Sequence, residues 1–129
     1  MVSATGIVTT ANDKLNGAPQ SLLHGMPAPL TSETIYEAAI RGDETAIEVF
    51  TETATYLGIA CANLINLLNL DMIVIGGGVM ASGEMLLGAA KRAAGSRSFA
   101  PAFRDCQIVQ SKLWPEAGVI GAAMLARDR

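Results

Sequence analysis

A short apolar run that ends in three consecutive glycines is the feature that most constrains this sequence. Residues 72–75 are Met-Ile-Val-Ile, and such β-branched runs favour a strand that is buried in a sheet. Gly76 to Gly78 follow at once, and a helical stretch opens at Ala81 or Ser82. This order predicts a strand, a turn and a helix, the unit that places ligands at the carboxyl edge of open α/β sheets.

The glycine turn is suited to binding because a backbone without Cβ atoms can approach a flat or charged ligand closely. The N–H groups that open the next helix can also face an anion. The alternative is a tight turn that binds nothing, although one or two glycines would suffice for that. Gly76 to Ala81 also fits the G-x-G-x-x-[GA] dinucleotide fingerprint, but the next predicted strand ends near Gln110 without the acidic residue that fingerprint needs.

The rest of the chain is dominated by helix signals, with Ser3, Thr31 or Ser32, and Asp43 as predicted N-caps. The predicted elements, in order, are a helix from Ser3 to Leu15, a loop over 17–30 with a helical turn at 21–24, a helix from Thr31 to Arg41, a long helix from Asp43 to Leu68, the strand at 72–75, a helix to about Ala93, a loop at 99–105, a strand at 106–113 and a last helix from Glu116.

Two helices are expected to be deeply buried. The C-terminal half of the long helix is apolar on almost all sides, so it is predicted to be buried all round, partly by a partner chain. The last helix is predicted to pack inward through Val119, Ile120, Ala123, Met124 and Leu125. The fold class is α/β and helix-rich, with a βαβ unit in the C-terminal half whose two strands belong to a larger sheet.

Composition excludes several classes of function. The chain has 129 residues, which suits one domain, and a net charge of -3 without a clustered basic face, so no nucleic-acid binding is expected. The longest apolar run, over 57–70, is too short to span a bilayer and contains asparagines, so no membrane association is expected. Cys61 and Cys106 lack metal-ligand spacing, so we expect two buried free thiols in the cytoplasm and no metal site.

The other polar candidates are given structural roles. His24 lies in a proline-rich loop and is expected to be exposed. Three acids at element boundaries are predicted to be caps or turn formers rather than a catalytic base, namely Asp43, Asp71 and Asp105. Three asparagines on the long helix are predicted to bond to loops and helix ends, with contact to a nucleotide or a missing lobe as the alternative, namely Asn63, Asn66 and Asn69.

The stretch YLGIACANLINLLNLDMIVIGGGVMASGEMLL, then an apolar strand and EAGVIGAAMLA, resembles the C-terminal lobe of the ROK family. That family contains bacterial glucokinases, other sugar kinases and sugar-responsive repressors. Val2 to Val8 resembles the helix after the family's cysteine-rich zinc motif, and Thr31 to Asp43 resembles its short helix with an acidic ending. The resemblance covers nearly the whole chain and implies a partial actin-like ATPase domain with a ribonuclease H-like core.

The resemblance also implies a role in binding ATP. In such kinases the triple-glycine turn lies against the adenosine of ATP between two lobes, which points to Gly77, Gly78 and Val79, with Gly76 and Gly83 as weaker candidates. Family members transfer the γ-phosphoryl group of ATP to a sugar hydroxyl with the help of Mg²⁺. The expected parent is therefore a glucokinase-like, ATP-dependent hexose kinase, a cytoplasmic homodimer with ATP and a hexose as its partners.

The sequence departs from the family pattern in ways that limit this expectation. The family's phosphate loop, catalytic aspartate, sugar-binding segment and zinc motif lie upstream of the matching region. Residues 1–129 are therefore expected to be the adenosine-side lobe without the N-terminal catalytic lobe, with no catalytic residue and no activity alone. Trp114-Pro115-Glu116 also stands where the family often has an Asn-Asp pair.

Two alternatives to the kinase function stay open. The chain is either the sugar-effector half of a ROK-type repressor or a stand-alone module that dimerises through its helices.

Overall fold

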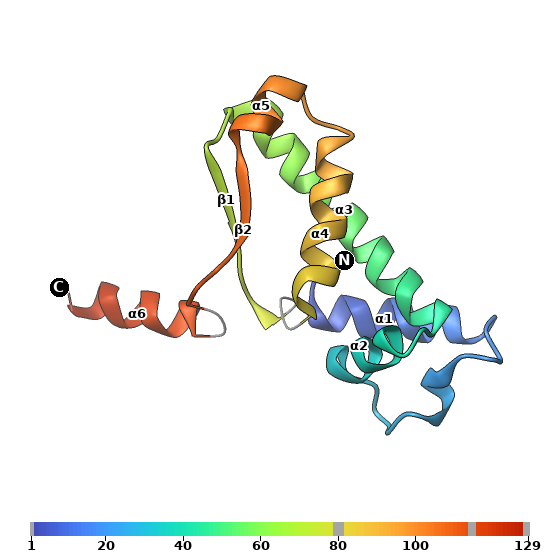
Figure 1. The fold of residues 1–129 in the computed structure, drawn as a ribbon. Helices are drawn as coiled ribbons and strands as arrows, with labels where there is room; N and C mark the ends of the chain where they lie inside the picture. The colour runs from blue at the N-terminus through green and yellow to red at the C-terminus, as the bar shows by residue number, and fades with distance from the viewer. Residues whose placement is uncertain (1, 79–81, 114–115, 128–129) are drawn as a thin grey trace.

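The computed structural model describes residues 2–78, 82–113 and 116–127. Within these ranges, helices precede and connect the two strands of a small parallel sheet, and one helix follows it (Figure 1). The elements are α1 (Ala4–Leu15), the 3-10 helix η1 (Leu22–Gly25), α2 (Ser32–Ile40), α3 (Glu44–Leu68), β1 (Met72–Ile75), α4 (Gly83–Gly95), α5 (Ala100–Asp105), β2 (Gln107–Gln110) and α6 (Ala117–Arg127).

The first three α-helices begin at side-chain caps, as the sequence predicted. Ser3 Oγ accepts a hydrogen bond of 2.9 Å from the Gly6 N–H at the start of α1. Thr31 and Thr34 form a reciprocal pair, in which each side-chain oxygen accepts from the other residue's backbone N–H, at the start of α2. Each cap satisfies N–H groups that a helix leaves unpaired at its first turn.

Asp43 caps α3 and also holds the preceding loop. Its carboxylate accepts hydrogen bonds from the Ala46 N–H at 2.8 Å, the Leu22 N–H at 2.6 Å and the Ser21 hydroxyl at 3.1 Å. The residue is buried, and such charge-assisted bonds are stronger than neutral ones. The predicted cap is confirmed, and the same side chain joins η1 to α3.

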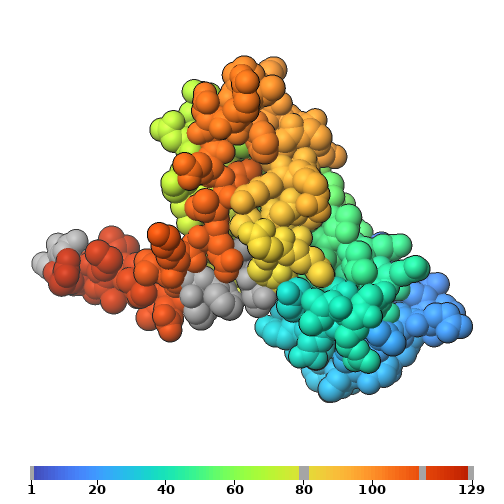
Figure 2. Space-filling view, in the orientation of Figure 1, coloured from blue at the N-terminus to red at the C-terminus, as the bar shows by residue number. Residues whose placement is uncertain are grey.

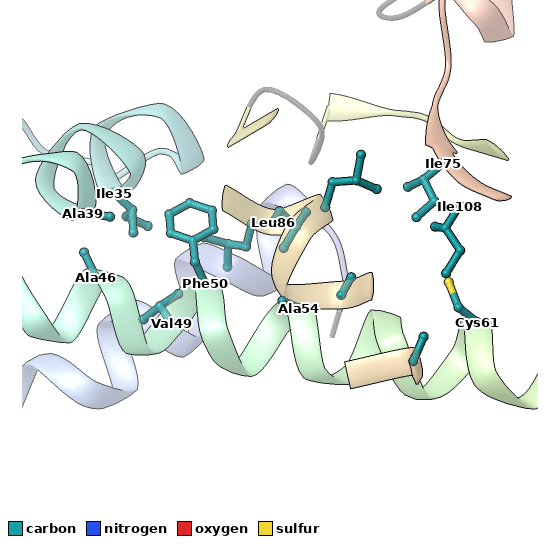
Figure 3. Close-up of a cluster of buried hydrophobic side chains, with 14 of the residues drawn as sticks. Ile35, Ala39, Ala46, Val49, Phe50, Ala54, Cys61, Ile75, Leu86 and Ile108 are labelled. Atoms are coloured by element: carbon teal, nitrogen blue, oxygen red, sulfur yellow. The ribbon is translucent and has the colours of Figure 1, made fainter. Parts of the chain in front are cut away.

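The core runs along α3, which packs closely against α4 (Figure 3). Phe50 and Leu86 are fully buried in it, and the ring of Tyr36 meets that of Phe50 edge-on at 6.0 Å between centroids. Cys61 and Cys106 are buried free cysteines, as predicted. Because α1 and α2 pack on the first half of α3 and the sheet lies at the other end, α3 connects the two parts of the fold (Figure 1).

The sheet consists of β1 and β2 in parallel, with Met72 opposite Gln107 and Ile75 opposite Gln110. The parallel pairing through a helix confirms the predicted βαβ unit. One face meets the helices through Ile75 and Ile108, which are buried. On the other face Met72 and Val74 are about half exposed, so the prediction of a strand buried on both faces is wrong for this chain. The reason is that nothing among the described residues covers that face.

Two boundaries differ from the sequence prediction. Residues 100–105, expected to be a loop, form the short helix α5, because Pro101 occupies its first turn, where a proline needs no N–H partner. The second strand was predicted over 106–113 and covers only Gln107–Gln110, the residues that pair with β1.

The predicted burial of two apolar segments is also wrong. α6 has no buried residue, and its Val119 and Leu125 are each 74% exposed. The helix extends away from the rest of the fold, so its apolar side chains find no packing partner there (Figures 1 and 2). The C-terminal half of α3 is buried only toward α4 and the sheet, and Leu67 on its other side is 80% exposed.

Candidate functional site

The glycine turn lies where the sequence placed it, directly after β1. Gly76, Gly77 and Gly78 are exposed, and Gly77 has φ 91°, a left-handed conformation that favours glycine. Among the described residues, no heavy atom lies within 4 Å of a β-carbon built at Gly77 or Gly78. The turn is therefore free to meet a ligand, and the conformation rather than crowding calls for glycine at Gly77.

The turn is fixed to the sheet on one side. The Ser111 N–H donates to the Ile75 carbonyl at 2.8 Å, which extends the parallel ladder to the start of the turn. A β-carbon at Gly76 would stand 3.5 Å from Ser111 Cβ, an ordinary contact. Gly83, a weaker candidate, opens α4 with φ 51° and has open space around it. Val79 lies outside the described residues.

The turn borders an open cavity of about 490 Å³. Its far wall is the N-terminal end of α1, so the fold brings together two segments that lie about 70 residues apart in the sequence. The described residues that line it are Val2, Ser3, Ala4, Leu57, Ile75, Gly76, Gly77 and Gly78. The α1 side was not predicted, because no residue type or motif within Val2 to Ala4 indicates a ligand.

The electrostatic character of the cavity comes from backbone groups. None of the eight described residues that line it has an ionisable side chain. The positive end of the α1 dipole and the unpaired N–H groups of its first turn lie at the wall, and Ser3 Oγ already accepts from Gly6. Apolar walls with a few polar backbone groups are typical of small-molecule sites, whose volumes are roughly 300–1,000 Å³.

These residues fit the nucleoside part of ATP but not Mg²⁺. The exposed glycines and the side chains of Leu57 and Ile75 can contact a flat base. Any side chain larger than that of glycine at Gly77 or Gly78 would fill the open space beside the turn. Mg²⁺ prefers carboxylate and phosphate oxygens, and the lining residues carry no carboxylate. Among the described residues, no cluster of three or more His, Cys, Asp or Glu side chains could hold a metal ion.

The other polar candidates lie away from this cavity. His24 is exposed, as expected, and its Nε2 lies 3.1 Å from the Ala18 carbonyl. Asn66 on α3 holds the segment after α4, because its side chain donates to the Arg97 carbonyl and accepts from the Phe99 N–H. Asn69 ends α3 in a left-handed conformation. The exposure of His24 and the structural bonding of Asn66 are thereby confirmed, while the side-chain bonds expected for Asn63 and Asn69 stay a prediction.

The remaining candidates lie at the boundaries of elements, and the roles of Asp71 and Asp105 as caps or turn formers stay predictions. Asp71 and Asp105 are exposed residues beside the sheet, and the Asp71 backbone carbonyl accepts from the Gln107 N–H at 2.8 Å. Glu116 precedes α6, and its carbonyl accepts from the Ile120 N–H. Trp114 and Pro115 lie outside the described residues. Within the described ranges, no helix combines the length and apolar character that crossing a membrane requires.

Comparison with known proteins extends these observations. The ROK family model matches residues 1–129. The chain is 34% identical to a glucokinase of Halalkalibacterium halodurans, over 100% of this chain and 40% of the relative. It is 28% identical to the DNA-binding transcriptional repressor Mlc of Escherichia coli, over 99% of this chain and 31% of that protein.

A solved structure agrees with the sequence matches. A ROK family glucokinase from Streptomyces griseus, in complex with glucose and AMPPNP, superposes with a TM-score of 0.83 and 28% identity, over 95% of this chain and 42% of that one. The chain thus spans about 40% of the length of these kinases. The expected helix-rich α/β fold related to actin-like ATPases is confirmed by this match. With a family match along its whole length, the chain belongs to the ROK family.

Proposed function

We propose that this chain forms the adenosine-side wall of the ATP cleft in a glucokinase-like ROK kinase, which transfers a phosphoryl group to a hexose. The observation that carries the proposal is the cavity in which the glycine turn faces the N-terminal end of α1. Two relatives support the activity. One is the H. halodurans glucokinase, and the other is the S. griseus glucokinase with glucose and AMPPNP bound.

In this proposal the chain binds and orients the nucleotide rather than reacting with it. The backbone at Gly77 and Gly78 approaches the adenosine, while Leu57 and Ile75 exclude water from one side of the base. ATP itself supplies the transferred phosphoryl group. None of the described side chains that line the cavity can accept the proton of a sugar hydroxyl, a task for a carboxylate or histidine. We therefore propose that the chain alone does not phosphorylate a sugar.

The second candidate function is the sugar-effector half of a ROK repressor. It is supported by the match to Mlc, which covers 99% of this chain, almost as much as the glucokinase match does. The two functions differ in their need for ATP. A kinase needs the glycine turn to accept a nucleotide, whereas an effector domain that recognises only a sugar does not.

A chimera tests the kinase proposal. The segment of the H. halodurans glucokinase that matches this chain is replaced by residues 1–129, and glucose-dependent ATP consumption is measured. We expect turnover, with a KM for ATP that rises by about tenfold in Gly77→Ala, because a β-carbon at this position occupies open space in the cavity that the adenosine would fill.

Gly42→Ala is the matched control for this experiment. Gly42 also has a left-handed backbone, at φ 88°, with no atom within 4 Å of a built β-carbon, but it lies in the turn between α2 and α3. The strain is therefore similar and the KM for ATP is expected to stay unchanged. A folded chimera that binds glucose but neither binds nor consumes ATP would favour the repressor function.

A homodimeric, cytoplasmic parent remains part of the proposal, and light scattering of the chimera tests the dimer.

A further inference from the structure

Among the described residues around the cavity of the glycine turn, only Ser3 has a polar side chain. The others that line it are glycines, an alanine and aliphatic residues. Aliphatic walls bury a nucleoside without orienting it, because orientation in small-molecule sites comes from a few well-placed polar groups. The hydroxyl of Ser3 is therefore the one described side-chain group at this cavity that can fix the position of a ligand by a hydrogen bond.

The Ser3 hydroxyl has a free donor. Its oxygen accepts the capping hydrogen bond from the Gly6 N–H at 2.9 Å. A serine hydroxyl can accept such a bond and still donate its own hydrogen, and no described residue accepts that hydrogen from Ser3. Because the capping bond already holds the oxygen in place, a ligand that accepts from Ser3 does not have to order the side chain first.

Ser3 and the glycine turn face the same space from different elements. Ser3 stands at the start of α1, Leu57 belongs to α3 and Gly77 follows β1, yet all three line one open cavity. Ser3 is only partly buried, so its hydroxyl can be reached from that cavity. A nucleoside that lies against the glycines is therefore faced by the Ser3 donor on the opposite wall.

We propose that Ser3 is a nucleotide-binding residue whose hydroxyl donates a hydrogen bond to the nucleoside, either to a ribose hydroxyl oxygen or to a ring nitrogen of the base. The inference rests on the proposed function and deepens it, because it assigns the contact that opposes the glycine turn. The hydroxyl meets no reacting atom in this arrangement. Its loss therefore weakens the binding of ATP without slowing the chemical step.

Substitutions in the chimera described above separate the donor from the helix cap. Ser3→Gly removes the hydroxyl, and glycine is tolerated at an N-cap with little loss of stability. We expect the KM for ATP to rise about fivefold, the effect of one hydrogen bond, with kcat unchanged. Ser3→Thr retains both cap and donor and should restore the KM. Thr31→Gly is the matched control, since Thr31 caps α2 with the same kind of bond but does not line the cavity, and it should leave the KM unchanged.

Nucleotide analogues identify the acceptor. Deoxyribose forms of ATP each lack one ribose hydroxyl, and deaza forms each lack one ring nitrogen. The analogue without the acceptor should raise the KM when Ser3 is present and should equal ATP in Ser3→Gly, because the two changes remove the same bond. An unchanged KM in Ser3→Gly, an equal rise in Thr31→Gly, or analogue effects that are the same with and without the hydroxyl would overturn this inference alone. A chimera that consumes no ATP would overturn the proposed function and this inference with it.

Discussion

Gly58 on α3 and Ala93 on α4 bring the two helix backbones into direct contact. A β-carbon at Gly58 would stand 2.5 Å from Ala93 Cβ and 2.6 Å from the Ala90 carbonyl oxygen, closer than such atoms approach in proteins. β1 follows α3 and α4 follows the glycine turn, so this contact also fixes the two elements that flank the candidate site (Figure 1). The sequence marks Gly58 only as a glycine within a helix.

Gly58→Ala is expected to destabilise the protein by about 1–3 kcal/mol, because the helices must move apart to admit the methyl group. Gly88→Ala on α4 is the control. A β-carbon there meets only the ends of the Arg92 and Glu84 side chains, at 3.6 and 3.7 Å, so the better helix propensity of alanine should stabilise by up to about 1 kcal/mol. Urea unfolding of both variants checks the prediction, and equal effects would contradict it.

Asp43→Ala is expected to cost about 2–4 kcal/mol, since it removes a helix cap and leaves the Leu22 N–H and Ser21 hydroxyl without their acceptor. Ser3→Ala removes a cap with a single hydrogen bond and should cost about 1 kcal/mol. Thermal unfolding monitored by circular dichroism compares the two. A loss for Asp43→Ala no greater than that for Ser3→Ala would show that the bonds to the loop contribute nothing.

The buried thiol of Cys61 makes stability depend on pH in the alkaline range. Burial, with a contribution from neighbouring Cys106, raises the pKa of Cys61 above its usual 9.0. The unfolded chain therefore loses this proton at a lower pH than the folded chain does. The stabilisation is fully present below about pH 9 and is lost as the pH rises through the folded pKa.

Urea unfolding between pH 7 and 10 checks this dependence. The midpoint should stay level up to about pH 8.5 and then fall, and Cys61→Ala should show a shallower fall. Cys61 should also react slowly with a thiol reagent at pH 7.5 in the folded protein, because it is only 2% exposed. A midpoint that rises from pH 8.5 to 10 would contradict the sign of the effect.

The sequence was most informative where the signal is local. Ser3, Thr31 and Asp43 are caps that act within a few residues of their own position, and all three begin helices as predicted. The strand and glycine turn were recognisable because β-branched residues followed by three glycines have few alternatives. α5 was missed since Pro101 stops a helix in most positions and is tolerated only in the first turn.

Features that depend on distant segments were not predictable from the sequence. The α1 wall of the cavity involves Ser3 and Ala4, which carry no chemical sign of a neighbour such as Gly77. The apolar faces of β1 and α6 indicated burial, but the pattern cannot say which polypeptide covers them. Val74 and Val119 are accordingly exposed here, although the pattern that led to their predicted burial is present.

Nucleotide contact with the glycine turn can be tested by following the amides of the isotope-labelled chain by NMR while AMPPNP is added to millimolar concentration. We expect shift changes at Gly76, Gly77 and Gly78 and at the α1 end, near Ser3 and Ala4, which weaken in Gly77→Ala and persist in Gly42→Ala. Changes confined to the separate groove formed by residues 17–22 and 41–45, or no changes at the glycine turn, would contradict this contact.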